Sequence, residues 1–419
     1  MNTTNIPSTS GPCPFSTGRT PSLMFSDGLY EGLAEARRAQ PVFYSHEVGH
    51  WVVTRYNDVL TVLQDTGHFS ARNAAVPVTP LHADARRILT EGEFSPETTV
   101  ASIDPPQHTR LRTAYNTQLN TAVAKLLEGD IRRIVAADIQ KLEGRRRVDL
   151  LADFTYELPA RVIFLLLGIP DEDVPIVKQL ATGRFQIDFA PSTREQQIAA
   201  STNLLGLWNY TCRLVQRRIR TPSNDFVGGL LALRNGDDGV LTINEINTIA
   251  YGLVFAGHET TTNQLTNTVR EMLLARANWE AICADPTLVP NAIEEGLRYC
   301  GTVIGWRRTA KEDHELSGVT VPKDAPILLS LAAANRDPAI FEDPERFNVH
   351  RKNARRHLTL GAGPHFCLGA PLTRLEMKIS LEALSQRYPS MRLVDGPSPP
   401  HYRTFIMRVP EQLMVDLEA

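Results

Sequence analysis

Cysteine is scarce in this chain of 419 residues, and its spacing suggests no pairing. The five cysteines are Cys13, Cys212, Cys283, Cys300 and Cys367, and no two of them form a C-x-x-C pair. An odd and scattered set argues against a disulfide framework and against a structural zinc site. We therefore expect a reducing compartment, which predicts a cytoplasmic protein.

Long apolar runs and a large net charge are also missing. The stretch from Ile163 to Leu167 is far too short for a bilayer, which needs about 18 apolar residues. A net charge of −3 and a pI near 6.4 give no reason to expect a nucleic-acid partner. Residues 1–21 are rich in Ser, Thr, Pro and Gly and have no apolar core, so they are predicted to be a disordered arm and not a signal peptide. No membrane anchor is expected.

The rest of the chain, residues 22–419, is predicted to form one mostly helical domain with a small β portion. Hydrophobic residues at 42% and charged residues at 22% are typical of a globular protein, and no composition break resembles a linker. Alternation around Gly49 predicts a β-hairpin over residues 41–56, and a second strand-rich stretch covers residues 315–331. Helical periodicity is strongest over residues 119–142, 158–167, 195–220 and 290–299.

The most informative helix is predicted to begin at a capping box, Thr242-Ile243-Asn244-Glu245, and to continue to about Leu274. At 1.5 Å per residue it would be roughly 50 Å long, enough to cross a domain. Its middle reads Ala256-Gly257-His258-Glu259-Thr260-Thr261-Thr262, which is a poor helix interior. Such a weak point can open a groove beside a ligand, with the Thr260 hydroxyl bonding a carbonyl or a guest. Ordinary core packing of a Thr-rich turn is equally compatible.

A glycine-punctuated loop, Leu360 to Gly369, presents Cys367 at the start of a helix. Backbone N–H groups and the helix dipole are expected to lower the pKa of its thiol. A thiolate held in this way is a strong fifth ligand for haem iron. A buried structural thiol is the ordinary alternative, and a Cys–His nucleophile pair with His365 is a weaker one, because residues two apart on a turn seldom meet.

Several charged residues elsewhere in the chain indicate a function only when they are considered together. Glu295 and Arg298 lie three apart on one helical face, where a solvated surface ion pair is the plain interpretation. His108 and Arg112 share another face at a spacing of four. With Arg308 and His357 they could bind two carboxylates, although each alone is more typical of a surface charge.

In this order along the chain, from about Pro41 onward, these segments resemble the cytochrome P450 family of haem-thiolate monooxygenases. Residues 360–369 look like the family's cysteine-ligand loop, except that Leu360 stands where Phe is usual. Residues 256–261 resemble its oxygen-activation segment, and Glu295 with Arg298 its Glu-x-x-Arg pair, with Arg346 as the arginine of the later loop. The resemblance implies an oxidoreductase with haem b between the long central helix and the helix after the cysteine loop, and with Cys367 on the iron.

The resemblance also implies roles for particular residues. Thr260 is expected to hydrogen-bond dioxygen or a nearby water, and Glu259 to relay protons from solvent. The substrate pocket is expected to include Gly252, Phe255, Val303, Ile304 and Phe405, which favour a small to medium apolar or aromatic substrate. The expected haem contacts are His108, Arg112, Ala256, Gly257, Arg308, His357, Gly361, His365, Cys367 and Gly369, with the propionates on His108, Arg112, Arg308 and His357.

Segments 41–45 and 51–56 look like the haem domain of self-sufficient bacterial members fused to a reductase. No reductase precedes Ala419, so we expect electrons from NAD(P)H to arrive through a separate ferredoxin or flavodoxin and its reductase. The basic cluster Arg351, Lys352, Arg355 and Arg356 is either a solvated loop or a docking patch for that partner.

Three other functions remain open at this stage. A peroxide-driven peroxygenase of the same fold often lacks the acid–alcohol pair, so Glu259 and Thr260 count against it. A non-catalytic haem-binding partner protein is disfavoured by the intact Cys367 and by the same pair. A zinc-dependent or cysteine hydrolase is the weakest alternative.

Overall fold

The computed structural model describes residues 28–394, 401–404 and 406–417. The predicted arm, residues 1–21, lies outside the described residues, as does Phe405. No helix among the described residues is long and apolar enough to span a bilayer.

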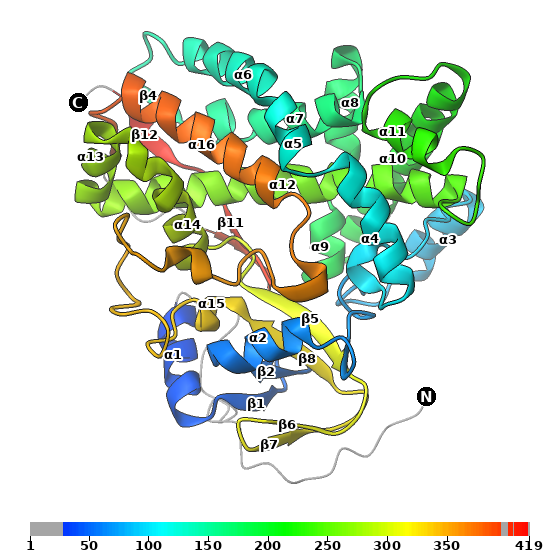
Figure 1. The fold of residues 1–419 in the computed structure, drawn as a ribbon, viewed down its shortest axis with the longest axis horizontal. Coiled ribbons are helices and arrows are strands. Elements are labelled where there is room, and N and C mark those ends of the chain that lie inside the picture. The colour runs from blue at the N-terminus through cyan, green and yellow to red at the C-terminus, as the bar shows by residue number, and fades with distance from the viewer. Residues whose placement is uncertain (1–27, 395–400, 405, 418–419) are drawn as a thin grey trace.

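Helices make up most of the described chain, as predicted (Figure 1). They are α1 Leu29–Ala39, α2 Tyr56–Gln64, α3 Ala83–Glu91, α4 Gln107–Gln118, α5 Thr121–Leu126, α6 Glu128–Lys141, α7 Glu157–Leu167, α8 Val174–Leu180, α9 Arg184–Phe189, α10 Arg194–Arg220, α11 Phe226–Arg234, α12 Ile243–Leu274, α13 Arg276–Ala284, α14 Val289–Tyr299, α15 Leu331–Ala334 and α16 Ala370–Arg387.

The strands form one sheet of five and three small sheets. The five-stranded sheet has the order β1-β2-β8-β5-β3, in which β2 and β8 are parallel and the other pairs are antiparallel. The predicted hairpin is β1 and β2, with Val42 opposite Val53. The strands are β1 Val42–Ser45, β2 His50–Val53, β3 Phe69–Ser70, β4 Arg147–Asp149, β5 Gly305–Ala310, β6 His314–Leu316, β7 Val319–Val321, β8 Pro326–Ser330, β9 Arg392–Leu393, β10 His401–Arg403, β11 Arg408–Pro410 and β12 Met414–Asp416.

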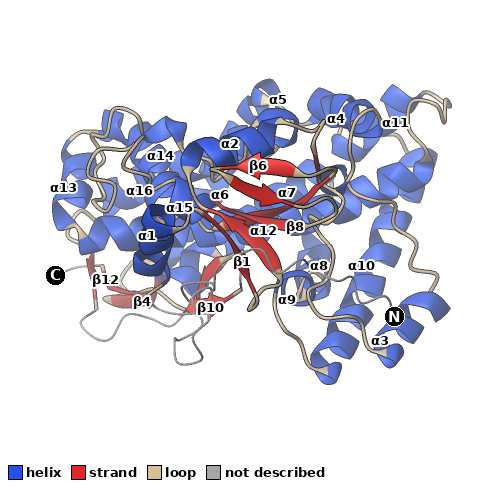
Figure 2. Cartoon of the chain, turned by 90° about the horizontal axis from the view of Figure 1, so that it is seen from below, coloured by secondary structure: helices blue, strands red, loops and turns tan. Residues whose placement is uncertain are grey.

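The five-stranded sheet lies at one end of the molecule, with α1 and α2 beside it, and the long helices fill the other end (Figures 1 and 2). The loop that leads into α16 runs between these two parts in Figure 1. Segments far apart in sequence therefore meet at the centre of the molecule, where a ligand can contact both parts.

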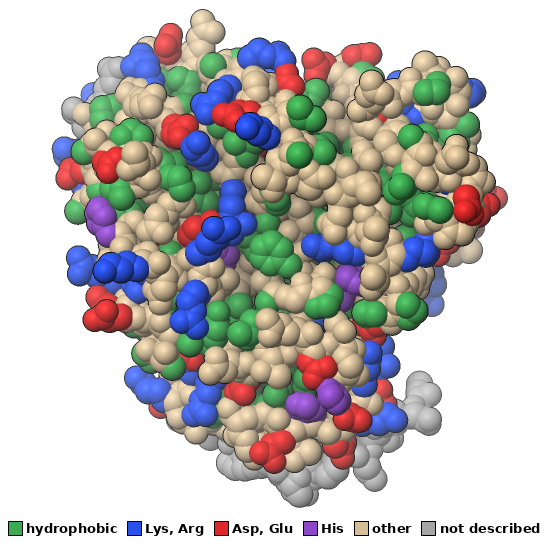
Figure 3. Space-filling view, viewed as in Figure 1, with side chains coloured by type: hydrophobic (Ala, Val, Ile, Leu, Met, Phe, Trp, Pro, Cys, Tyr) green, Lys and Arg blue, Asp and Glu red, His purple; other side chains and the backbone are tan. Residues whose placement is uncertain are grey.

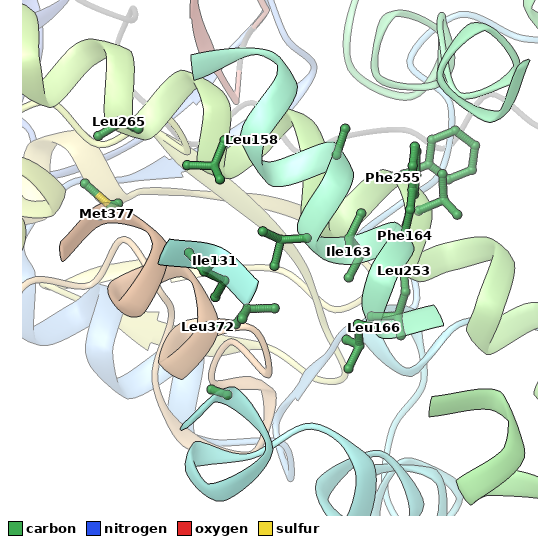
Figure 4. Close-up of a cluster of buried hydrophobic side chains, with 14 of the residues drawn as sticks. Ile131, Leu158, Ile163, Phe164, Leu166, Leu253, Phe255, Leu265, Leu372 and Met377 are labelled. Carbon is green, nitrogen blue, oxygen red and sulfur yellow. The ribbon is translucent and has the colours of Figure 1, made fainter. Parts of the chain in front are cut away.

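Helix α12 is the axis of the helical part. It begins at the predicted capping box, in which the Thr242 side chain accepts from the Glu245 N–H and the Glu245 carboxylate accepts from the Thr242 N–H. Its 32 residues give a length of about 48 Å. Figure 4 shows apolar side chains of α6, α7, α12 and α16 packed together, among them Ile163, Leu265 and Leu372. This packing fixes α12 and α16 relative to each other.

One predicted helix is wrong in its extent. The periodic stretch from residue 119 to 142 is two helices, α5 and α6. The Asn120 side chain caps α5 by accepting from the N–H groups of Ala122 and Val123. Glu128 and Asp130 lie in the first turn of α6, where acidic side chains stabilise a helix start. The apolar period continues across both helices, which is why the sequence pattern shows no break.

Candidate active site

A cavity of about 370 Å³ lies between α12 and the segment that leads into α16. One face of helix α12 lines it, and Gly252, Ala256 and Thr260 follow one another along this face at intervals of about one turn. The other lining residues are mostly apolar and include Val100, Ile163, Phe185, Trp306 and Met407, together with the loop of residues 359–369. The long helix and the cysteine loop, which are about a hundred residues apart in sequence, thus share one enclosed space.

The sulfur of Cys367 faces this cavity. The Cys367 N–H donates to the Leu360 carbonyl over 2.8 Å, which closes the loop, and α16 begins three residues later at Ala370. The sequence predicted a lowered pKa for the thiol, and in the protein alone this is wrong. Burial raises the pKa of Cys367, while the N–H groups of Gly369 and Ala370 and the Arg112 guanidinium act in the opposite direction. A bound metal cation would supply the stabilisation that a thiolate needs at this position.

The loop geometry around this cysteine depends on two glycines with positive φ, Gly361 at 74° and Gly363 at 69°. A Cβ on Gly363 would also lie 2.9 Å from the backbone of α2, at the Gln64 Cα. Only glycine combines this conformation with so close a contact. His365 does not turn toward the thiol, because its ring packs against the His108 ring at 4.1 Å between centroids. This arrangement gives no support to a Cys–His nucleophile pair.

Four basic side chains gather at one end of the site. Arg112, Arg308 and His365 line the cavity, and His108 adjoins His365. Several buried polar atoms here have no hydrogen-bond partner among the described residues: both ring nitrogens of His108, Nε2 of His365 and one terminal nitrogen of Arg308. Burial and the neighbouring cations lower the pKa of His365 to about 3, and burial lowers that of Arg308 to about 10. A ligand with two carboxylates would supply hydrogen-bond acceptors and negative charge for these basic side chains.

The predicted oxygen-activation segment is helical throughout, and part of it faces the cavity. Ala256, Gly257, Thr260 and Thr261 all line the space, and the Thr260 hydroxyl donates to the Ala256 carbonyl over 2.8 Å. A Cβ on Gly257 would lie 2.7 Å from the Ile163 side chain, so glycine allows α7 to approach α12 closely at this point. The segment therefore presents a narrow wall of Ala256 and Gly257 with two threonines, Thr260 and Thr261, beside them.

Glu259 does not line the cavity. It lies close to Tyr156, because burial and the Glu259 charge both raise the pKa of the Tyr156 hydroxyl. No ion pair or hydrogen bond of its carboxyl occurs among the described residues. Burial raises its pKa to about 7. A carboxyl with a pKa near neutrality exchanges protons readily, as a relay requires.

The residues expected in the substrate pocket differ in their position relative to the cavity. Gly252 and Val303 line the cavity, whereas Phe255 and Ile304 do not and belong to the buried core. Phe255 packs edge-on against Tyr251 at 5.0 Å between centroids, because it is one position away from the lining face of α12. Ile304 points away from its neighbour Val303, as successive side chains do in extended backbone. Phe405 is outside the described residues.

The predicted propionate contact of His357 is wrong. Its Nε2 lies 3.0 Å from a Glu294 carboxylate oxygen, and its Nδ1 accepts from the Thr359 N–H. Both ring nitrogens are therefore engaged away from the cavity. Arg374 binds the same Glu294 carboxylate, and these partners lower the pKa of Glu294 to about 2. The His357–Glu294–Arg374 cluster ties α14 to α16.

Glu295 and Arg298 form a buried ion pair, so the interpretation as a solvated surface pair is wrong. Both side chains have no exposed surface. The second arginine on Glu295 is Arg351 and not Arg346: the Arg351 Nε donates to both carboxylate oxygens over 3.1 Å. Arg346 contributes only its backbone carbonyl, which accepts from Arg298 and Arg351, while its side chain is exposed. The buried Arg351 consequently does not belong to a surface patch.

Sequence patterns missed two polar residues that line the cavity on α16, Thr373 and Glu376. Both lie on a helix whose sequence mixes apolar and charged residues on all sides, and a Glu in a helix is normally exposed. The only signal was their spacing of three, which places them on one face.

The fold and this cavity match one known family. A family model described as Cytochrome P450 matches residues 279–415. The chain is 35% identical over 370 residues to mycinamicin IV hydroxylase/epoxidase of Micromonospora griseorubida, which covers 87% of this chain and 89% of that one. It superposes on the structure of cytochrome P450 CREJ in complex with (4-ethylphenyl) dihydrogen phosphate with a TM-score of 0.89, at 33% identity and covering 93% and 97% of the two chains. An intact type IV self-sufficient cytochrome P450 monooxygenase gives a TM-score of 0.92 at 30% identity, covering 97% of this chain and 54% of that one.

This chain belongs to the cytochrome P450 family, and it is a monooxygenase of the oxidoreductase class. The family implies haem and dioxygen as cofactors. The residues present fit haem: one cysteine sulfur faces the cavity, and unpartnered basic groups at one end suit two propionates. No cluster of three potential metal ligands of the His, Cys, Asp or Glu type occurs in the described part of the chain.

Proposed function

We propose that this protein is a haem-thiolate monooxygenase that inserts one oxygen atom from dioxygen into a small to medium apolar or aromatic compound. Electrons come from NAD(P)H through a separate ferredoxin, or a flavodoxin, and its reductase. The observation that carries the proposal is that the Cys367 thiol and the Thr260 hydroxyl line the same apolar cavity. When bound, haem supplies the oxidising chemistry.

The protein's own residues then have distinct tasks. Cys367 is the iron ligand. Arg112, Arg308, His108 and His365 hold the two propionates, which supports a fixed orientation of the ring. Thr260 donates or accepts a hydrogen bond in the groove beside Ala256 and Gly257. Glu259 moves protons from the Tyr156 side of α12 toward that groove, and its pKa of about 7 suits a group that both takes up and releases protons near neutral pH.

The substrate class is supported by the side chains beyond the haem contacts. Val100, Ala101, Phe185 and Val303 are apolar, whereas Thr99 and Thr302 are polar. A related structure holds a small aromatic molecule, (4-ethylphenyl) dihydrogen phosphate. An alkylbenzene or alkylphenol is therefore a suitable first probe. Turnover of 4-ethylphenol with NADPH, ferredoxin and reductase tests the proposal, and turnover with hydrogen peroxide alone would favour the peroxygenase alternative.

The Thr260→Ala variant is expected to uncouple NADPH consumption from product formation. Its hydroxyl is the only polar group that residues 252–260 contribute to the cavity wall, and general acid–base groups typically contribute a factor of about 10² or more. The measurement is the ratio of product to NADPH consumed, with peroxide quantified. Thr260→Ser keeps the hydroxyl and should retain coupling. Equal coupling in the alanine and wild-type proteins would exclude this role for Thr260.

The face that carries the cysteine loop is proposed to dock the electron donor. Lys352, Arg355 and Arg356 are exposed there, and Phe366, next to the ligand cysteine, is 38% exposed. Figure 3 shows basic side chains around an apolar area at the middle of this face. This combination suits an acidic ferredoxin, because charge steers the encounter and the apolar centre holds it.

Reversing two of these charges, in Arg355→Glu/Arg356→Glu, is expected to weaken ferredoxin binding about tenfold or more at low salt. The difference from wild type should shrink as ionic strength rises, because salt screens exposed charges. Titration of ferredoxin against NADPH oxidation at several salt concentrations measures it. The control is Arg145→Glu/Arg147→Glu. Arg147 is the first residue of β4, and Arg145 lies two residues before it. Equal ferredoxin titrations for both double variants would place the docking surface elsewhere.

A further inference from the structure

A glutamine stands in the wall of the mostly apolar cavity. Gln264 follows Thr260 by one turn of α12 and lines the cavity, and only 3% of its surface is exposed. Burial of an amide costs free energy unless its oxygen and its nitrogen are hydrogen-bonded. The hydrogen bonds of Gln264 therefore indicate what this side chain does at the edge of the cavity.

Both polar atoms of this amide bind protein groups. The Gln264 Oε1 accepts from the Thr302 N–H over 2.9 Å, and its Nε2 donates to the Thr268 hydroxyl over 3.2 Å. A longer contact of 3.5 Å joins Nε2 to the Cys300 carbonyl. The Thr268 hydroxyl donates its own hydrogen to the Gln264 backbone carbonyl, so its oxygen is the acceptor for Nε2, and the amide has one consistent orientation. The carbon chain of Gln264 is what remains for the cavity.

The segment that Gln264 holds belongs to no helix or strand. It runs from the end of α14 at Tyr299 to the start of β5 at Gly305, and two of its residues, Thr302 and Val303, line the cavity. The position of such a segment depends on the partners of its backbone N–H and C=O groups. Thr302 is only 2% exposed, so solvent does not replace the Gln264 oxygen as the acceptor of its N–H.

A second segment of the cavity wall is held through the same residues. The Thr302 carbonyl accepts from the Arg408 N–H over 2.9 Å, and Val303 forms a β-bridge with Met407, which also lines the cavity. Asn267 lies about one turn further along α12, and its Nδ2 donates to the Thr302 hydroxyl and to the Arg408 carbonyl, both over 3.3 Å. Two amides on one side of α12 therefore hold both segments against the helix.

We propose that Gln264 is a positioning residue that determines substrate specificity: its amide holds Thr302 and thereby fixes Val303 and Met407 in the wall of the substrate cavity. This inference rests on the proposed monooxygenase function and names the residue that sets the shape of its pocket. Contact between the amide and the substrate is not required, because both polar atoms are already engaged. A change in an apolar pocket by the size of one methylene group alters discrimination between ligands by about tenfold or more.

The first experiment measures the shape of the pocket with two ligands of haem iron, imidazole and 4-phenylimidazole. Both bind through a ring nitrogen, but the phenyl group extends further into the cavity. Difference absorption spectra of the ferric holoenzyme give the two Kd values. Gln264→Met has a chain of the same length without the amide, and it is expected to change the ratio of these Kd values by about tenfold. Gln264→Glu keeps an acceptor for the Thr302 N–H in either protonation state and should match wild type.

The matched control is Gln197→Met. Gln197 lies on α10, is 2% exposed and does not line the cavity. Its Oε1 accepts from the His82 N–H over 2.6 Å, and its Nε2 donates to the Pro80 carbonyl over 3.3 Å. Both methionine variants remove a buried amide from backbone partners, so both should unfold at lower urea concentration than wild type. Only Gln264→Met should change the Kd ratio. An unchanged ratio in Gln264→Met, or an equal change in Gln197→Met, overturns the proposal.

The second experiment measures the position of the segment itself. Hydrogen exchange of the backbone amides of residues 300–304, followed by mass spectrometry of the holoenzyme, should be faster in Gln264→Met than in wild type, because the Thr302 N–H loses its acceptor. Gln264→Glu and Gln197→Met should exchange at this segment like wild type. Equal protection of the segment in Gln264→Met and wild type would mean that the amide does not hold it, and would overturn the proposal.

The possible failures are distinguishable. A wild-type protein without the thiolate band in its reduced CO complex contradicts the proposed function and this role together. A normal band with an unchanged Kd ratio in Gln264→Met overturns the role of Gln264 alone. If Gln264→Met does not take up haem, Asn267→Ser provides the same test, because it removes the second amide that binds Thr302. An unchanged Kd ratio in that variant likewise overturns the proposal.

Discussion

The Cys367→Ser protein is expected to lose the thiolate Soret band of the reduced, CO-bound state and all NADPH-driven oxidation of substrate. Cys367 lines the cavity, and none of the other three cysteines that the structure describes does so. A serine hydroxyl is far less acidic than a thiol and is a poor ligand for haem iron. Difference spectra of the reduced protein with and without CO, on protein matched for haem content, measure this effect.

The protein should remain folded after this change, which makes the result specific. Without iron, burial holds the pKa of the Cys367 thiol above its usual value, so the uncharged thiol makes no ion pair that serine would break. Cys300→Ser is the control, because Cys300 is buried, lies outside the cavity and donates to the Gly296 carbonyl. It should keep the band. A thiolate band in Cys367→Ser, or its loss in Cys300→Ser, would contradict the ligand assignment.

The sequence predicted the parts of the site that depend on local backbone. The capping box at Thr242 is a contact between residues three apart, and Gly361 and Gly363 are required by the turns that they themselves form. The start of α12 follows from such short-range chemistry. These features can be read without knowing the rest of the chain.

Side-chain partners across the fold could not be predicted in the same way. Arg346 and Arg351 are five residues apart in one irregular loop, and only packing decides which guanidinium turns inward. His357 and His365 pose the same problem: both precede the cysteine closely, but one ring turns to Glu294 and the other to His108. Glu376 escaped notice because burial of a carboxyl is decided by α12, over a hundred residues earlier in the chain.

A second large effect is expected from the buried cluster of Glu295, Arg298 and Arg351. Glu295 accepts from Arg298, Arg351 and the Asn348 N–H, and Arg298 also donates to the carbonyls of residues 335, 344 and 346. Every charge in it is paired in a space without solvent. Removing one member breaks a buried ion pair, and such a loss typically costs about 3–5 kcal/mol.

Comparison of two arginine variants tests this cluster and the assignment of its third member. Arg351→Ala should lower the free energy of unfolding by about 3–5 kcal/mol, since it removes two hydrogen bonds to the Glu295 carboxylate and the donors to the carbonyls of residues 342, 343 and 346. Arg346→Ala should cost less than about 0.5 kcal/mol, as for ordinary surface substitutions, because alanine keeps the backbone carbonyl that the cluster uses. Urea unfolding of the two proteins, followed by circular dichroism, gives both values. The reverse order of stability would mean that Arg346 is the partner of Glu295, and equal small losses would mean that the loop is held by its backbone contacts and not by the ion pair.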